Sequence, residues 1–411
     1  MARRVLHVLS QRPSLTGSGV TLDAVVRHAA VAGWEQQVIV GTPADDPTPA
    51  VGDLPTDRVD ALTFAGEGGS ARGDLTFPLP GMSDVMPYRS TRFSQLTSDQ
   101  LTHYRAAWQQ KVQTVVARFA PDVIHAHHAW LLSSWLQGCT AGVPVVTHTH
   151  GTALRQRQLS PALATEVEAG FGAHSRLVVL HEEHARQYSS WLGLESSQVR
   201  VVGAGYADET FSCQGRSADA VPTVVYAGKL SHAKGLPWLL DAIEALGKKS
   251  SALVFHVAGG GEGAESDELR ARMAALAPLV EYHGRLAPAD LAALLRRAWL
   301  FVLPSFYEGL PLVLVEALAS GCRVVSTELP GVVSGLQPHV EHDLELVELP
   351  RLYSVDQPVD ADLPAFVVRL AAAVERGLES GPLVRPGIHL DPFTWRAVFE
   401  RIAAVWAEAI A

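Results

Sequence analysis

Residues 300–327 read LFVLPSFYEGLPLVLVEALASGCRVVST, and this stretch decides the fold class of the chain. It begins with a short apolar run, 300–305, and passes through a turn at 306–310 into a second apolar segment, 311–320. A β-rich run follows at 322–327. A strand that leads through a tight turn into an apolar helix and then into another strand is typical of a parallel α/β sheet.

The same alternation extends along the chain in both directions. Expected strands cover 5–10, 36–41, 143–151 and 175–181 in the first half and 223–228, 252–259 and 280–284 in the second. Expected helices cover 20–32, 236–246, 266–277, 288–298 and 393–410, and another ends near residue 119. Each half therefore predicts a Rossmann-like, doubly wound unit.

A polar, turn-rich segment without apolar periodicity, 208–222, separates the two halves and is interpreted as the interdomain linker. The predicted domains are then 1–207 and 223–390, followed by a terminal helical segment, 391–411. The long segment 66–100 has little periodicity. Its interspersed Phe, Met and Tyr residues predict an ordered loop that contacts something, because long loops in compact domains are usually functional or disordered.

The composition indicates a globular protein. Of 411 residues, 47% are hydrophobic and 18% are charged, and the net charge of −10 argues against nucleic acid or an anionic membrane as the main partner. The three cysteines are scattered and form neither a disulfide framework nor a metal pattern, which predicts a reducing cytoplasm. The opening MARRVLHVLS is expected to form a first strand rather than a signal peptide, and at most peripheral membrane contact is expected.

Glu316 is the unusual residue of the apolar helix. All residues from Gly309 to Ala319 except Glu316 are apolar, so the helix is expected to be buried nearly all round. A buried carboxylate is costly unless it is paired or hydrogen-bonded, and the hydroxyl groups of a ribose would supply the donors. An ordinary helix glutamate is the alternative.

The turn before this helix predicts a site for a sugar phosphate. A helix N-terminus presents free backbone N–H groups and a positive dipole end, which favour phosphate. Gly309 lets the backbone approach a ligand closely, and Leu310 belongs to the same turn. Glu308, at the mouth of the helix, could bind hydroxyl groups of a sugar, although a plain turn glutamate would look the same.

Two lysines follow the first strand of the second half in the segment YAGKLSHAKG, 226–235. Ligands of doubly wound sheets bind beyond the carboxyl ends of the strands. Lys229 and Lys234 are therefore expected to bind a diphosphate and to lie with Glu316. Two solvated surface lysines are the alternative.

Two glycines, Gly17 and Gly19, follow the first strand of the chain. The third glycine of a dinucleotide fingerprint would fall at Leu22, which disfavours an NAD-binding protein. Backbone amides at the two glycines could still approach a phosphate. A tight strand–helix turn explains them equally well.

Histidines close two predicted strands of the first half: His125, His127 and His128 on one, His148 and His150 on the next. A zinc site needs suitable ligands that converge. No carboxylate or cysteine joins these histidines, so no metal is expected. His150 is the best candidate for the floor of a binding cleft.

Two further patterns carry less weight. The glycine run 259–263 ends another strand and could wall a nucleotide pocket, or could be a plain loop. The acidic triplet 360–362, Asp-Ala-Asp, resembles a short metal-binding motif of other sugar transferases but lies among prolines in an expected loop.

Together these residues resemble glycosyltransferase family 4, over nearly the whole chain. The most specific part is Glu308 and Glu316 within 300–327; in similar proteins the first glutamate contacts the donor sugar and the second the ribose. The segment 228–235 matches a family motif that usually reads Gly-Arg-Leu-x-x-x-Lys-Gly, here with Lys229 in place of the arginine and with Lys234 conforming.

The resemblance extends to the first half of the chain. His150 falls on the T-x-H position, implicated near the reacting sugar, and Gly17 or Gly19 matches a loop that touches the diphosphate. The usual Asn-Gly-Val-Asp segment is replaced by GAGYAD at 203–208, a departure from the family pattern.

The resemblance implies the GT-B fold: two Rossmann-like domains that face each other across a cleft, with the last helix crossing back onto the first domain. It implies transfer of a hexosyl or related group, with retention at the anomeric carbon, from a nucleoside diphosphate sugar such as a UDP-sugar. The expected acceptor is a hydroxyl group of a small molecule, lipid or glycan, bound by the first domain with its 66–100 loop. Lys234, Glu308 and His150 are the expected catalytic residues, with no cofactor and no metal.

Three other functions stay open at this point. A sugar-nucleotide 2-epimerase of the same fold would convert a UDP-sugar without an acceptor. A two-lobed binding protein would hold a small ligand and consume nothing. An NAD oxidoreductase would require the glycine fingerprint that is broken at Leu22.

Overall fold

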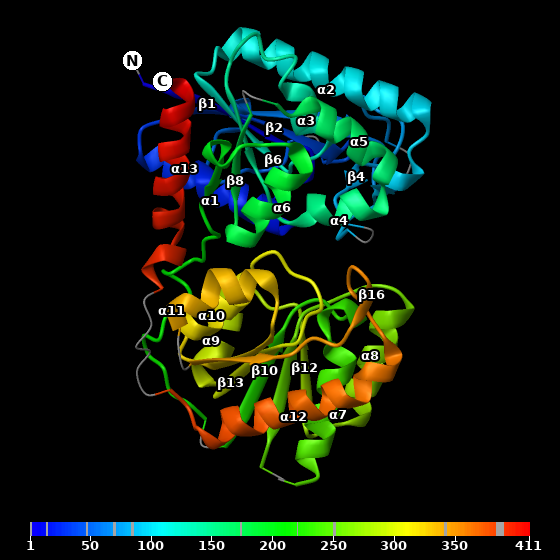
Figure 1. Cartoon of the computed structure of the whole chain (residues 1–411), viewed down its shortest axis with the longest axis vertical. Coiled ribbons are helices and arrows are strands. Elements are labelled where there is room, and N and C mark those ends of the chain that lie inside the picture. Colours follow the sequence, from blue (N-terminus) through cyan, green and yellow to red (C-terminus); the bar gives the residue numbers. More distant parts are fainter. Residues whose placement is uncertain are drawn as a thin grey trace. The chain divides into compact units, whose positions relative to one another are not determined.

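The computed structural model describes all residues except 1, 14, 47, 69, 70, 84, 85, 173, 174, 220, 250, 251, 341, 342 and 384–389. The chain forms two compact units, each built around its own parallel sheet. Unit 1 comprises Met1–Ala204 and Trp395–Ala411, and unit 2 comprises Gly205–Thr394. Figure 1 shows helices on both faces of each sheet.

The sheet of unit 1 has the strand order β3-β2-β1-β6-β7-β8-β9, with every neighbouring pair parallel. Its strands are β1 (Arg4–Leu9), β2 (Glu35–Pro43), β3 (Val59–Phe64), β6 (Val123–His127), β7 (Val145–His148), β8 (Arg176–Val179) and β9 (Val199–Val201). The order reverses between β1 and β6. The carboxyl ends of these two strands therefore mark the switch point at which doubly wound sheets bind ligands.

The helices of unit 1 are α1 (Gly17–Val31), α2 (Ser98–Phe119), α3 (Leu131–Leu136), α4 (Thr152–Leu159), α5 (Pro161–Gly170), α6 (Glu182–Leu192) and α13 (Trp395–Ile410). The last helix, α13, lies beside α1 although the two are far apart in sequence (Figure 1). Aromatic residues line this contact: Phe399 stacks on His28 with ring centroids 6.0 Å apart, and Trp406 meets Trp34 edge-on at 5.0 Å. Apolar packing of the final helix thus fixes it to unit 1.

The segment 66–100 packs into the core of unit 1. Phe77, Met82, Tyr88 and Phe93 are each less than 10% exposed and belong to the same buried cluster as the sheet. Two short strands, β4 (Pro80–Gly81) and β5 (Thr91–Arg92), pair within it. The aromatic residues that predicted an ordered loop therefore contact the core of their own unit.

The sheet of unit 2 has the order β12-β11-β10-β13-β14-β15, again entirely parallel, and it reverses between β10 and β13. Its strands are β10 (Thr223–Ala227), β11 (Val254–Ala258), β12 (Val280–Gly284), β13 (Leu300–Leu303), β14 (Arg323–Thr327) and β15 (Leu344–Val347). The main helices are α7 (Leu236–Gly247), α8 (Ala264–Ala275), α9 (Pro288–Arg297), α10 (Leu312–Ala319) and α12 (Leu363–Glu379). No helix among the described residues combines the length and apolarity that a membrane crossing requires.

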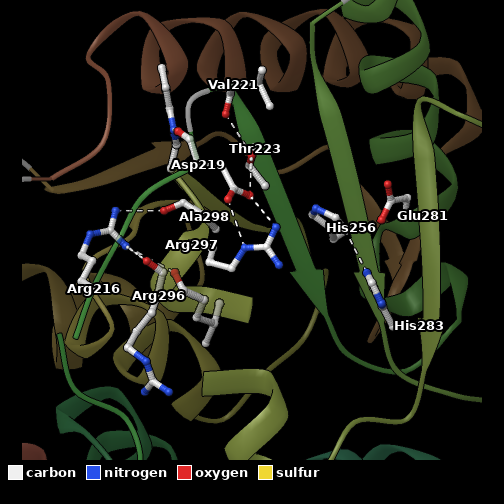
Figure 2. Close-up of polar contacts among 12 residues, drawn as sticks. Arg216, Asp219, Val221, Thr223, His256, Glu281, His283, Arg296, Arg297 and Ala298 are labelled. Carbon is white, nitrogen blue, oxygen red and sulfur yellow. Dashed lines mark hydrogen bonds and ion pairs between the residues drawn. The ribbon is translucent and has the colours of Figure 1, made fainter. Parts of the chain in front are cut away.

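Residues 208–222, predicted to be an interdomain linker, belong to unit 2. Figure 2 shows part of the reason: the Arg216 guanidinium reaches back to carbonyl oxygens at the C-terminal end of a helix. Its nitrogens donate to Arg296 O at 3.0 Å and Ala298 O at 2.9 Å, after α9, and to Ser320 O at 3.3 Å, after α10. A cation at helix C-termini satisfies carbonyls that the helices leave unbonded. The polar composition that suggested a linker instead supplies a cap.

Asp219, in the same predicted linker, makes two further contacts with unit 2. Its carboxylate pairs with Arg297 at 3.0 Å, and its carbonyl oxygen accepts a hydrogen bond from Trp299 Nε1 at 2.7 Å (Figure 2). The two chain crossings between the units also lie side by side, because Tyr206 N–H donates to Phe393 O at 2.8 Å.

Candidate functional site

The loops that follow β10 and β13 meet at the switch point of unit 2. Phe306 N–H, after β13, donates to Ala233 O, after β10, at 2.9 Å. The Lys234 ammonium forms an ion pair with Oε1 of Glu308, and Ser305 Oγ donates to the same oxygen at 2.9 Å. The structure thus brings together two of the predicted site residues, which lie 74 positions apart in the sequence.

Glycines allow these loops to approach one another. Gly235 has a φ of +71°, and a Cβ atom there would lie 2.0 Å from Pro304 O. Gly259, with a φ of +139°, would place a Cβ atom 1.7 Å from Gly228 O. Both positions exclude other residues by conformation and by contact. The start of the glycine run 259–263 therefore allows close packing against the loop at 228–235, which contains Lys229 and Lys234 and is called the lysine loop below. A role of the glycine run as a pocket wall stays a prediction.

Tyr226, on β10, hydrogen-bonds to the backbone of the lysine loop. Its hydroxyl group donates to Lys229 O at 2.6 Å, and its ring is fully buried in β10. Burial raises the pKa of this phenol well above its ordinary value, and the nearby Glu308 carboxylate adds to the shift, so the hydroxyl stays a proton donor. Sequence reasoning missed this role, because a tyrosine within a strand looks like any core aromatic residue.

Helix α10 opens directly beside this pair. It begins at Leu312, with Pro311 at the N-cap and no side chain that caps its first turn. Leu312, Val313 and Glu316 are partly exposed, while the other residues of the helix are buried. The predicted all-round burial is therefore wrong for one side of the helix, and Glu316 lies on that open side, one turn from Leu312.

The Glu316 carboxyl has a perturbed acidity. Burial raises its pKa from 4.5 to about 7, and no cation offsets the shift. Lys234 forms its ion pair with Glu308, and the expectation that Glu316 lies with both lysines stays a prediction. Desolvation without a paired charge leaves Glu316 able to accept strong hydrogen bonds from a ligand.

Unit 1 carries a similar junction at its own switch point. Gln11 follows β1, and its Oε1 lies 3.1 Å from His128 Nε2, after β6. Ser18 Oγ donates to the same oxygen at 3.1 Å, and His128 Nδ1 lies 3.0 Å from Thr152 Oγ1. Because Gln11 Oε1 can only accept, this network assigns the proton to His128 Nε2. Gln11 was not singled out from the sequence, since no motif marks it.

The two predicted glycines lie inside the first turn of α1 rather than before it. Helix α1 begins at Gly17, and the side chain of Thr16 accepts the Gly19 N–H at 3.2 Å. That amide is therefore already used by the cap. A Cβ atom on Gly17 would meet no atom within 4 Å, so packing does not require glycine there.

The predicted histidines form one buried column at the carboxyl ends of β6 and β7. Ring centroids are 4.8 Å apart for His125 and His127 and 4.7 Å apart for His148 and His150. His127 Nδ1 lies 3.0 Å from His150 Nε2. Burial lowers the pKa of every ring in the column, so all are neutral at pH 7. His150 lies two residues beyond the end of β7 and is the partly exposed member of the column.

Two groups of side chains in the described part of the chain could hold a metal ion. One is His7, His125 and His127, whose donor atoms lie within 4.8 Å of one another and which are fully buried. The other is His256, Glu281 and His283 in unit 2. The acidic triplet 360–362 is in neither group: Asp362 makes a bidentate pair with Arg351, at 2.8 Å for both contacts.

Comparison with known proteins adds the family. The model described as Glycosyltransferase Family 4 matches residues 15–209, and the model described as Glycosyl transferases group 1 matches residues 221–348. The chain belongs to the GT-B glycosyltransferases of the family 4 type. The predicted resemblance is confirmed, and its two family segments fall on units 1 and 2.

Curated relatives of this glycosyltransferase are moderately similar. The glycogen synthase of Mycobacterium tuberculosis is 29% identical over 229 residues, which cover 52% of this chain and 53% of that protein. The chain thus matches about half the length of that relative. D-inositol 3-phosphate glycosyltransferase 1 of Catenulispora acidiphila is 29% identical over 70% of this chain and 72% of that protein.

Solved structures confirm the predicted GT-B fold. Sucrose-phosphate synthase from Thermosynechococcus elongatus has a TM-score of 0.67 at 17% identity and is covered over 99% of both chains. HepE of Anabaena, solved in complex with UDP and glucose, has a TM-score of 0.61 at 16% identity over 98% of this chain and 99% of that chain. At these identities the likeness concerns the fold.

Proposed function

We propose that this glycosyltransferase moves a sugar from a nucleoside diphosphate sugar to a hydroxyl acceptor. The observation that carries the proposal is the Lys234–Glu308 ion pair at the switch point of unit 2. In the proposed reaction the bond between the anomeric carbon and the diphosphate oxygen breaks, and a bond to the acceptor oxygen forms. The acceptor loses its proton, and the nucleoside diphosphate leaves.

Lys229, Lys234 and the first turn of α10 are proposed to bind the diphosphate. Negative charge grows on the diphosphate as the glycosidic bond breaks, so ammonium groups and free helix N–H groups fixed in place lower the barrier. Two observations support this. No side chain caps the first turn of α10, and Gly235 lets the lysine loop pack closely against Pro304, just after β13. No step of this mechanism requires a metal ion or another cofactor.

Glu308 and Glu316 are proposed to bind hydroxyl groups of the donor, the first on the sugar and the second on the ribose. Glu308 already accepts hydrogen bonds from Lys234 and Ser305, which fix its carboxylate at the mouth of α10. Glu316 lies one to two turns further along the open side of the same helix. Ribose hydroxyls would supply the donors that its desolvated carboxyl lacks.

The acceptor is proposed to bind to unit 1. There His150 lies two residues beyond the end of β7 and is partly exposed. The contact of Gly17 or Gly19 with the diphosphate of the donor stays a prediction. Retention at the anomeric carbon is part of the proposal by the family resemblance. The nucleotide is proposed to be UDP, which is bound in the solved structure of HepE, whose fold this chain shares.

A donor panel tests the function directly. The melting temperature is measured with UDP-, GDP-, ADP-, CDP- and TDP-glucose, because a ligand that binds the folded state raises it. The best donor is then incubated with candidate acceptors, and release of nucleoside diphosphate is followed together with the anomeric configuration of the product. Conversion of the UDP-sugar without an acceptor would indicate a 2-epimerase instead. Binding with no turnover across the acceptor panel would indicate a binding protein.

A further inference from the structure

The group His256, Glu281 and His283 lies at the edge of the sheet in unit 2, apart from the residues assigned to the donor. His256 is on β11 and the other two are on β12, the outermost strand of the sheet. Figure 2 shows the His283 ring directed at the ring of His256, with the Glu281 side chain beside them. His256 Nδ1 lies 2.9 Å from His283 Nε2 and 3.3 Å from Glu281 Oε2.

The backbone is built to converge these side chains. His256 is directly opposite Glu281 in the parallel register, so both side chains project from the same face. The register then shifts: Val257 pairs with Tyr282 but Ala258 pairs with Gly284, which leaves His283 as the extra residue of a bulge. A bulge on an edge strand locally redirects its side chains.

The donor set and its spacing suit a divalent metal ion. Two imidazoles and a carboxylate are a known ligand set for zinc, with bonds of about 2.0–2.2 Å. Tetrahedral bonds of that length place donor atoms roughly 3.3 Å apart, close to the contacts of 2.9 Å and 3.3 Å at His256 Nδ1. An ion there would take the position of the proton that the two rings otherwise share.

Access and charge also favour this group over the buried histidines of unit 1. The side chain of Glu281 is 54% exposed and His283 is exposed, so an ion can enter from solvent and keep water as a further ligand. Glu281 supplies negative charge, and Arg297, which also faces His256, is paired with Asp219. His7, His125 and His127 offer no carboxylate, and an uncompensated divalent charge in a fully buried site is costly.

We propose that His256, Glu281 and His283 form a binding site for a zinc-type divalent cation that clamps the edge strand β12 to β11. The proposed role of the ion is structural. Strand β11 leads directly to Gly259 and β12 ends at Gly284, and Gly259 N–H donates to Gly284 O at 2.7 Å. An ion would therefore stiffen the base of the glycine run.

The test uses the full-length chain without a purification tag, stripped of metal with a chelator. Zn²⁺ binding is measured by calorimetry, and Co²⁺ binding by the visible absorption of the bound ion. The variants are Glu281→Gln, His283→Ala and the double variant. Both side chains are exposed, so their replacement leaves the core intact. His103→Ala, an exposed histidine on α2, is the matched control.

Wild type and H103A should bind one equivalent of either ion. H283A should bind either ion at least about 10-fold more weakly, because loss of a residue that only hydrogen-bonds to a metal ligand already has an effect of that size. The double variant should bind more weakly still. Zn²⁺ should raise the melting temperature of wild type and leave that of the double variant unchanged. The proposal is overturned if the wild type takes up neither ion. It is equally overturned if the double variant retains the wild-type affinity, which would place the ion elsewhere, for example at the buried histidines.

Discussion

The ammonium group of Lys234 and the carboxylate of Glu308 form an ion pair that joins the loops after the two strands at which the order of the second sheet reverses. The side chains are 27% and 15% exposed, so the pair is open to a ligand from solvent. Partly exposed pairs add little to stability. The pair matters for its position, because it holds a positive charge and a hydrogen-bond-accepting carboxylate near the start of α10.

Replacement of Lys234 by alanine should abolish most sugar transfer while the protein folds normally. Loss of one fixed donor to developing charge typically lowers kcat about 100- to 1,000-fold. The measurement is the rate of nucleoside diphosphate release at saturating donor and acceptor. Lys248→Ala removes an exposed lysine of the same unit, 73% exposed and paired within its own helix, and should act like wild type. Full activity in K234A would remove Lys234 from the diphosphate site.

The affinity for an intact nucleotide sugar should fall as the pH is lowered from about 8 to 6. The pKa of Glu316 is raised to about 7, so this range converts the carboxylate, the better acceptor for ribose hydroxyls, to its neutral acid. An intact donor is used because its diphosphate does not titrate here. Glu316→Gln should bind more weakly at pH 8 and lose this pH dependence. If E316Q followed the wild-type pH profile, another group would be responsible.

The same residue predicts a stability effect in the absence of ligand. The folded-state pKa lies above the unfolded value of 4.5, so the folded state binds more protons and stability should decrease as pH rises from about 4.5 to 7. Because Glu316 is partly exposed, the loss should be about 1–2 kcal/mol. Chemical denaturation at pH 5 and pH 8 measures it. E316Q should show a smaller decrease between the two values than wild type.

His150→Ala should impair transfer without weakening donor binding. The donor residues proposed above all lie in unit 2, whereas His150 lies in unit 1 and contacts His127 at 3.0 Å. We expect kcat to fall about 100-fold, as for other fixed polar groups near a reacting centre. The donor-induced rise in melting temperature should persist. A lost thermal shift with normal folding would instead assign His150 to donor binding.

Arg216→Ala should destabilise unit 2. The guanidinium donates to carbonyl oxygens after both α9 and α10, and its loss leaves several of them without a partner, which should cost about 2–4 kcal/mol. The midpoint of urea denaturation measures the effect. The control is Arg351→Ala, which removes an exposed arginine paired with Asp362 and should change the midpoint little. Equal midpoints for R216A and wild type would show that the Arg216 hydrogen bonds contribute no net stability.

Much of the architecture could be predicted from the sequence, because the spacing of apolar residues and the turn residues that end each element are local features. The predicted strand at 280–284 matches β12, and the helices expected at 236–246 and 393–410 match α7 and α13 within two residues at each end. The helix α12 was not predicted. It spans Leu363–Glu379, directly after the acidic triplet, which forms a short 3-10 helix rather than the expected loop.

The sequence by itself determined the two α/β units, the loops that end their strands and the residue types offered there, because chain-local patterns of apolar residues and glycines encode them. Only the tertiary structure decided the partners. Lys234 pairs with Glu308, Gln11 Oε1 lies within hydrogen-bond distance of His128, and Arg216 in the predicted linker donates to carbonyl oxygens at helix ends. Such pairs join positions that are distant in sequence, and which of them form depends on strand order and on close backbone packing.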